Sequence, residues 1–162
     1  MTKILLILHV LAAVIAVGPV TVAGSMFPAA VRRATGPSDG KEAVAAVRLL
    51  HRICRVYAVV GLAVPVFGFA TAGSLHVLGT PWLVVSIVLT GLAALVLALL
   101  ILPAQETVLA DLTRTDSGAA TAAARLEPAR IRRLAMLTGT FNLLWATVTV
   151  LMIVRPGSTT GV

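Results

Sequence analysis

Residues 56–105 read VYAVVGLAVPVFGFATAGSLHVLGTPWLVVSIVLTGLAALVLALLILPAQ and contain no charged side chain. About 20 consecutive apolar residues in a helix are enough to cross the hydrocarbon core of a bilayer. This stretch is therefore long enough to cross a membrane twice. The residues Gly79-Thr80-Pro81 form a turn signal that divides it into two halves. The stretch thus predicts two membrane-spanning helices joined by a tight turn.

Two further runs with the same property flank this stretch. Neither Ile4–Val31 nor Leu134–Val154 contains a charged residue. We therefore expect an all-α membrane protein, a four-transmembrane-helix bundle made of two helical hairpins, that forms a single domain over residues 1–162. The expected spans are residues 4–27, 57–78, 82–102 and 134–154. The first is expected to stop near Pro28 and the third at Pro103, because proline interrupts helical hydrogen bonding.

The composition excludes most soluble classes of protein. Of the 162 residues, 59% are hydrophobic and 12% are charged, whereas an ordinary soluble domain has about 25% charged residues. The net charge of +7 does not indicate a nucleic-acid-binding protein, because the basic residues flank the spans and no aromatic-rich stacking surface accompanies them. Anionic lipid at the cytoplasmic face accounts for the same charge.

The basic residues also predict an orientation. All 13 of them except Lys3 and Arg155 lie in the two gaps 28–56 and 103–133. Segments rich in Lys and Arg stay in the cytoplasm, so both gaps are expected there and both termini outside. The abundance of Ala, Val, Leu, Gly and Arg suggests a bacterium, and hence a multi-pass protein of the bacterial plasma membrane. In the first gap, apolar residues at helical spacing suggest that the second span is the end of one long helix.

Small and polar residues mark one face of each span. Membrane helices associate through such residues, because leaving lipid brings no hydrophobic gain. The residues at three- and four-residue spacing are His9, Ala13, Ala16, Val20 and Gly24 in the first span; Gly61, Pro65, Gly68, Ala72 and His76 in the second; Trp82, Ser86, Thr90 and Ala93 or Ala94 in the third; and Thr138, Asn142, Trp145, Thr149 and Met152 in the fourth. These faces are expected to meet inside the bundle.

Three potential metal ligands fall on one membrane side in this scheme. They are His9, His76 and Met152. Imidazole and thioether ligands suit copper, and two imidazoles suit a haem iron. The alternative is structural: a histidine near a membrane interface hydrogen-bonds a neighbouring helix or a headgroup, and the methionine is ordinary packing. Both interpretations remain open from the residues alone.

Other polar residues have similar pairs of interpretations. Asn142 is either an interhelical hydrogen-bonding residue or a substrate contact, and Trp145 beside it is core packing or part of the same contact. Ser86 and Thr90 are interior polar residues. His51 and Cys54, one helical turn apart, are a redox or metal pair or simply residues of the headgroup region. The predicted lipid-headgroup anchors are Arg52, Arg55, Arg130, Arg132 and Arg133. The alternative for these arginines is a site for an anionic lipid or an anionic substrate.

Motifs for enzymatic chemistry are missing from the sequence. It contains no phosphate-binding glycine loop, no Cys-x-x-Cys and no pair of acidic residues within a span. The absence of an acidic residue in any span argues against proton coupling. The sequence therefore favours a protein without enzymatic activity.

The opening Ile-Leu-His9-Val-Leu-Ala-Ala-Val-Ile, followed by Gly18-Pro19, resembles the first span of a broad set of small bacterial membrane proteins. The chain resembles an uncharacterised family of four-span integral membrane proteins. More distantly, its first span is similar to the copper-resistance D family and to membrane haem proteins of the protoporphyrinogen-oxidase-like type. This resemblance implies a histidine of metal or haem relevance at His9.

Three functions follow as expectations. The first is a non-enzymatic accessory, assembly or binding protein that forms a homo-oligomer or joins a larger membrane complex. The second is a membrane protein that binds haem or copper through His9 and His76, with Met152 as a further metal ligand. The third is a small oligomeric transporter or channel.

Overall fold

The computed structural model describes residues 2–36, 40–116 and 128–157, and within them every secondary-structure element is a helix. These ranges contain four helical stretches long and apolar enough to span a membrane: Thr2–Ala34, Lys41–Leu75, Pro81–Arg114 and Pro128–Val154. The chain is therefore a multi-pass membrane protein. The predicted all-α four-helix bundle is confirmed.

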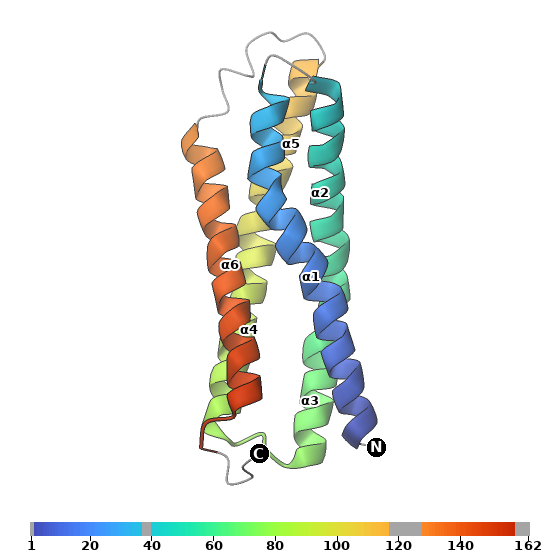
Figure 1. The fold of residues 1–162 in the computed structure, drawn as a ribbon, viewed down its shortest axis with the longest axis vertical. Coiled ribbons are helices and arrows are strands. Elements are labelled where there is room, and N and C mark those ends of the chain that lie inside the picture. Colours follow the sequence, from blue (N-terminus) through green and yellow to red (C-terminus); the bar gives the residue numbers. More distant parts are fainter. Residues whose placement is uncertain (1, 37–39, 117–127, 158–162) are drawn as a thin grey trace.

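The first hairpin consists of α1 (Thr2–Ala34) packed against α2 (Gly40–Val60) and α3 (Ala63–Leu75). In the second hairpin, α4 (Pro81–Leu95), the π-helix η1 (Val96–Ile101) and α5 (Leu102–Asp116) form one continuous stretch, of which α4 and η1 pack against α6 (Pro128–Val154). The hairpins meet where α1 contacts α6 and α2 contacts α5. The start of α1, the α3–α4 turn and the end of α6 lie at one end of the bundle (Figure 1).

Proline breaks the second stretch between α2 and α3. Pro65 has no N–H, and its ring crowds the carbonyl group four residues earlier, which belongs to Gly61. The backbone responds with three-residue hydrogen bonds: Leu62 N–H donates to Val59 O at 3.1 Å and Val64 N–H donates to Gly61 O at 3.0 Å. The expected long helix is thus present, but it has a break within the membrane.

Two other prolines do not end their helices. The sequence suggested that the first helix stops near Pro28 and the third at Pro103. Instead, α1 continues through Pro28 to Ala34, and α5 continues past Pro103 to Asp116. In the third stretch, η1 lies directly before Pro103, and the N–H of Leu102 bonds five residues back to Leu97 O. A π turn of this kind widens the helix, which makes room for the proline ring.

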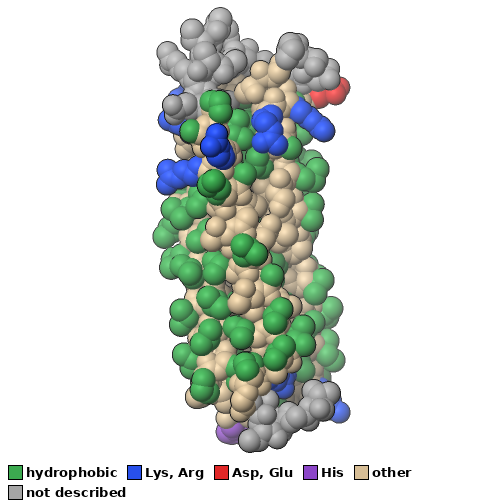
Figure 2. All heavy atoms as spheres, turned by 60° about the vertical axis from the view of Figure 1, so that its left-hand side comes forward, with side chains coloured by type: hydrophobic (Ala, Val, Ile, Leu, Met, Phe, Trp, Pro, Cys, Tyr) green, Lys and Arg blue, Asp and Glu red, His purple; other side chains and the backbone are tan. Residues whose placement is uncertain are grey.

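Two apolar clusters hold the bundle together. The larger fills the arginine-rich half and includes the buried side chains of Phe27, Val47, Ile101 and Leu134. The smaller lies at the opposite end, where Ala72 of α3 meets Trp82 and Leu83 of α4. On the face viewed in Figure 2, most of the visible Lys and Arg side chains gather at one end and hydrophobic side chains cover much of the remainder. This distribution fits a bundle that stands in a bilayer.

Candidate functional site

A groove of about 210 Å³ opens between α1 and α6. Its walls come from both hairpins, and its lining residues are Ser25, Pro28, Arg32, Ala135, Thr138, Gly139 and Asn142. Exposed apolar side chains flank it on each helix, namely Met26 at 56% exposed and Met136 at 65%. The groove is therefore reached sideways, from the lipid phase.

Two contacts between α1 and α6 lie at the end of this groove that is farther from the arginine-rich end of the bundle, here called the deep end because it is nearer the membrane centre. Gly24 packs so closely on α6 that a Cβ atom there would lie 3.1 Å from Cγ2 of Thr138. One residue further along, Asn142 Nδ2 donates a hydrogen bond to Ser25 Oγ at 3.1 Å. The Oδ1 atom of Asn142 is buried and has no hydrogen-bond partner among the described residues. A hydrogen-bond acceptor without a partner in the described residues thus belongs to a residue that lines the groove.

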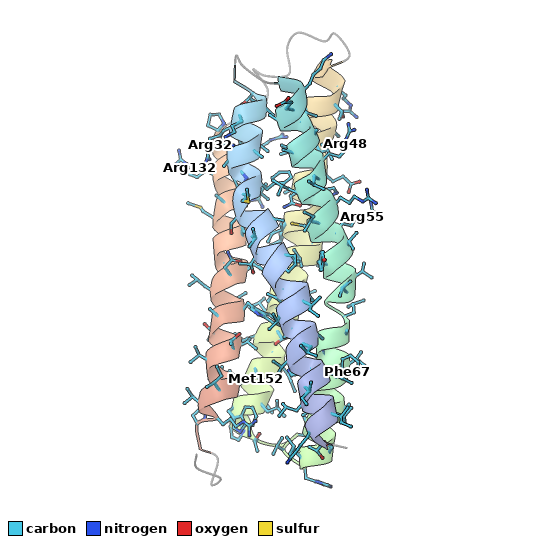
Figure 3. The ribbon with its side chains drawn as sticks, turned by 45° about the vertical axis from the view of Figure 1, so that its right-hand side comes forward. Arg32, Arg48, Arg55, Phe67, Arg132 and Met152 are labelled. Atoms are coloured by element: carbon cyan, nitrogen blue, oxygen red, sulfur yellow. The ribbon has the colours of Figure 1, made fainter. Side chains whose placement is uncertain are left out.

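The other end of the groove is basic. Arg32 contributes to its wall, and Arg132 lies on α6 one helical turn before Ala135. Figure 3 shows Arg32 and Arg132 at a similar height along the bundle. No ion pair is found for either within the described residues. Long side chains on a helix lean toward its N-terminus, which directs Arg32 along α1 toward Ser25.

Pro28 shapes the wall between these two ends. It is buried within α1, and because it has no N–H, the carbonyl group of Gly24 lacks its ordinary helical donor. Gly139 on the opposite wall has no atom within 4 Å of the place where a Cβ would stand. The middle of the groove is thus open above Gly139 and lined by small or apolar groups.

A second polar cluster is fully enclosed between α2 and α5. His51 Nδ1 lies 3.2 Å from Gln105 Oε1, and Gln105 Nε2 donates to Cys54 Sγ at 3.6 Å. Gln105 and Cys54 are 0% exposed and His51 is 9% exposed. Because an amide oxygen only accepts, the Nδ1 atom of His51 carries the proton. The cluster ties the two hairpins together and has no opening to a ligand in this arrangement.

His9 has a partner on the broken helix. Its Nδ1 atom lies 2.9 Å from the carbonyl oxygen of Val64, so this nitrogen is the donor. The ring lies against Gly68, where a Cβ would be 3.0 Å from His9 Cε1. Since Nδ1 is protonated, the lone pair of the neutral ring is on Nε2.

His76 and Met152 lie elsewhere at that end of the bundle. His76 caps the C-terminus of α3 in a left-handed conformation with φ of 56° and is exposed. It is eight residues beyond Gly68, or about 12 Å at 1.5 Å per residue. Met152 packs against the cluster of Ala72, Trp82 and Leu83. Within the described residues, no three His, Cys, Asp or Glu side chains are grouped to hold a metal ion.

The remaining interior polar residues are bonded within their own helices. Ser86 Oγ donates to Trp82 O at 2.8 Å, and Thr90 Oγ1 donates to Ser86 O at 2.7 Å. Trp145 is half-buried. These hydroxyl groups satisfy their hydrogen bonds locally and project no donor toward a ligand.

The predicted anchors Arg52, Arg55, Arg130, Arg132 and Arg133 are all exposed. Arg130 forms an ion pair with Asp111 of α5 at 3.7 Å. An exposed pair of this kind contributes little to stability, so it orients α6 beside α5 rather than holding the fold.

The chain matches no family model, no curated protein and no solved structure. Its function is therefore inferred from its own geometry.

Sequence reasoning missed two residues of these sites. Ser25 is adjacent to Gly24, which was expected in the interior, and its hydroxyl group is the partner of Asn142. Gln105 stands at the end of the uncharged run 56–105. Asn142 and Gln105 carry the side-chain amides of this sequence, and each lies within or next to an apolar run. A polar group in such a place needs a hydrogen-bond partner, and this requirement was the available signal.

Proposed function

We propose that this chain is a non-enzymatic binding protein of a bacterial plasma membrane that takes up a lipid-like amphiphile in the α1–α6 groove. It acts as an accessory protein, holding or presenting its ligand within the bilayer. Both termini face outward and the arginine-rich end faces the cytoplasm, in keeping with the positive-inside rule. In this orientation the groove opens into the inner leaflet.

The unused Oδ1 acceptor of Asn142 is the observation that carries this proposal. A buried polar group without a partner costs about 1–3 kcal/mol, and this one belongs to a residue that lines the groove. A bound amphiphile with a hydrogen-bond donor removes that cost. The basic mouth and the open middle of the groove supply the other two contacts that an amphiphile needs.

The test uses two glycines with equally open surroundings. Neither Gly139 nor Gly18 has an atom within 4 Å of the place where a Cβ would stand, so neither clashes on enlargement within the chain. Gly139→Leu fills the groove, whereas Gly18→Leu lies outside it. Native mass spectrometry of the purified full chain should show retained lipid on the wild type and on Gly18→Leu, and loss of it on Gly139→Leu. Equal retention by all three proteins contradicts the proposal.

A second candidate function is haem or copper binding through His9. The hydrogen bond from Nδ1 to Val64 O supports it, because metal-binding histidines commonly donate their other nitrogen to a carbonyl group. His76 and Met152, the other residues of this hypothesis, would have to approach His9 from their present positions. A Soret band or stoichiometric copper in protein from supplemented cells, lost in His9→Ala, supports this candidate. A colourless, metal-free sample rejects it.

The assembly role and the oligomeric transporter or channel remain predictions from the sequence. A face of α4 and η1 with exposed small residues, Gly91, Ala94 and Ala98, is where another helix can approach closely. Cross-linking through this face in native membranes distinguishes a homo-oligomer from a complex with another protein.

A further inference from the structure

Three features of the α1–α6 groove constrain the chemistry of its ligand, and this inference rests on the proposed function. They are the guanidinium groups at its mouth, for which no ion pair is found in the described part of the chain, the buried acceptor at its deep end and its volume. The first two select the polar groups of the ligand, and the volume limits how much of the ligand is enclosed.

The basic mouth selects an anion. Arg32 lines the groove and Arg132 lies one turn from the lining residue Ala135. The acidic side chain for which ion pairs are found in the described residues, Asp111, is bound to Arg114 and Arg130 instead. Guanidinium groups bind phosphate through parallel hydrogen bonds. A ligand with a phosphate at this level therefore compensates the charge of Arg32.

The deep end selects a hydrogen-bond donor. Asn142 Nδ2 is bonded to Ser25 Oγ, and its Oδ1 atom has no partner among the described residues. On the membrane side of its phosphate, a diacyl phospholipid has only ester groups, which accept hydrogen bonds and cannot donate one to Oδ1. A free hydroxyl group donates to it. Ser25 lies seven residues from Arg32, about 10 Å along α1, and the lean of the Arg32 side chain shortens that separation.

The volume limits how much of a ligand the groove can enclose. Sites that enclose a whole small molecule measure about 300–1,000 Å³, whereas this groove measures about 210 Å³ and opens sideways. It holds part of one ligand while the remainder stays in the bilayer. The walls at Ala135 and Gly139 are small, and exposed Met136 and Leu143 border them. An acyl chain that leaves the groove along α6 therefore meets exposed apolar side chains.

We infer that the groove binds an anionic lysophospholipid: a single-chain glycerophospholipid with a net negative phosphate headgroup and a free glycerol hydroxyl group. The phosphate binds Arg32, with Arg132 as a second cation. The hydroxyl group donates to Asn142 Oδ1. The acyl chain lies over Gly139 and continues into the leaflet.

Three single-chain lipids test the two polar features separately. Oleoyl lysophosphatidic acid has both the anionic phosphate and the hydroxyl group, its 2-O-methyl ether has the same phosphate and chain but no free hydroxyl group, and oleoyl lysophosphatidylcholine has a zwitterionic headgroup. Titration of the delipidated full chain, followed by native mass spectrometry, should give about tenfold tighter binding of the first lipid than of either other, as expected for one charged or buried hydrogen bond.

Variants assign each preference to a residue. Arg32→Gln, at an exposed position, should remove the preference over lysophosphatidylcholine. Asn142→Leu should remove the preference over the 2-O-methyl ether, and Gly18→Leu, which lies outside the groove, should keep it. Arg32 is exposed, so Arg32→Gln should fold normally. Its effect on lipid preference therefore tests the inference even when Asn142→Leu folds poorly.

The outcomes separate this inference from the proposed function. Equal affinity for the three lipids, with binding still blocked by Gly139→Leu, overturns the lysophospholipid and leaves a less selective lipid groove. Binding that Gly139→Leu does not change overturns both. A third outcome is that a membrane protein, and not a lipid, co-purifies with the wild type and is lost from Gly139→Leu. This result identifies the groove as a helix-docking site and also overturns the inference.

Discussion

The imidazole of His9 is held between two residues of one broken helix: its Nδ1 atom is 2.9 Å from the Val64 carbonyl oxygen, and its ring rests on Gly68. This contact joins α1 to α3 directly beyond the break at Gly61 and Leu62. Pro65 follows Val64, so the hydrogen bond lies where the helix is weakest. Hydrogen bonds between membrane helices contribute about 0.6–2 kcal/mol, and this one stabilises α3 against α1.

Gly68 is expected to be essential to this contact. Gly68→Ala places a Cβ 3.0 Å from His9 Cε1 and 3.2 Å from Nδ1, which displaces the ring and weakens its bond to Val64. The expected loss is about 1 kcal/mol of unfolding free energy, measured by denaturation in mixed micelles. Gly73→Ala on the same helix is the control, because its Cβ meets nothing within 4 Å. It should be neutral or stabilising, since alanine favours helix over glycine. If Gly68→Ala and Gly73→Ala change the unfolding free energy equally, the contact between Gly68 and His9 does not stabilise α3 against α1.

Gln105 is expected to have a larger effect. Gln105→Leu leaves His51 Nδ1 buried without its acceptor, and an unpaired buried donor costs about 1–3 kcal/mol. The loss should appear as a lower midpoint of thermal unfolding in detergent.

His51→Phe in the Gln105→Leu background provides the check. Once both polar groups are replaced by apolar ones, no buried donor is left unpaired. His51→Phe should therefore lower the midpoint of thermal unfolding less in the Gln105→Leu background than in the wild-type protein. Additive costs would mean that the two residues act independently.

Gly24 and Thr138 offer a test by compensation. Gly24→Ala brings a Cβ within 3.1 Å of Thr138 Cγ2 and pushes α1 away from α6. We expect loss of stability and a longer Ser25–Asn142 separation, seen as reduced cross-linking between cysteines placed at these two positions. Thr138→Ser removes Cγ2 and keeps the hydroxyl group, so the double variant should recover both. If the double variant does not recover stability and cross-linking, the effect of Gly24→Ala does not arise from its contact with Thr138 Cγ2.

Orientation has its own experiment. Cys54 is the only cysteine and is buried, so Cys54→Ala gives a background without thiols. Gly79 and Gly36 are exposed at opposite ends of the bundle. In intact cells, an impermeant maleimide should label Gly79→Cys and leave Gly36→Cys unlabelled until the membrane is opened. The reverse pattern would move the groove to the outer leaflet.

Much of the fold could be predicted because its signals are local. The lengths of the uncharged runs and the turn at Gly79-Thr80-Pro81 are enough for four helices in two hairpins. Helical spacing also identified interior residues correctly on α1, where Ala16, Val20 and Gly24 are buried. These features depend on neighbouring residues along one helix.

The continuation through Pro103 and the two polar clusters could not be predicted in the same way. Pro103 is tolerated because the π turn of η1 precedes it. The residue types of this segment do not by themselves predict a π turn. Gln105 pairs with His51 across 54 positions, and Asn142 pairs with Ser25 across 117. Such pairings depend on how far each helix rotates about its axis, which packing of the whole bundle decides.

The helix that continues through Pro103 also determines how far the protein reaches. The stretch Pro81–Arg114 has 34 residues, or about 51 Å at 1.5 Å per residue, while the hydrocarbon core is about 30 Å thick. Even when tilted, roughly two to three turns of this helix stand beyond the hydrocarbon. The stretches Thr2–Ala34 and Lys41–Leu75 are about as long, with 33 and 35 residues, and they reach the same side (Figure 1). The protein therefore presents a group of helix ends, and not a single helix, to the water on the arginine-rich side.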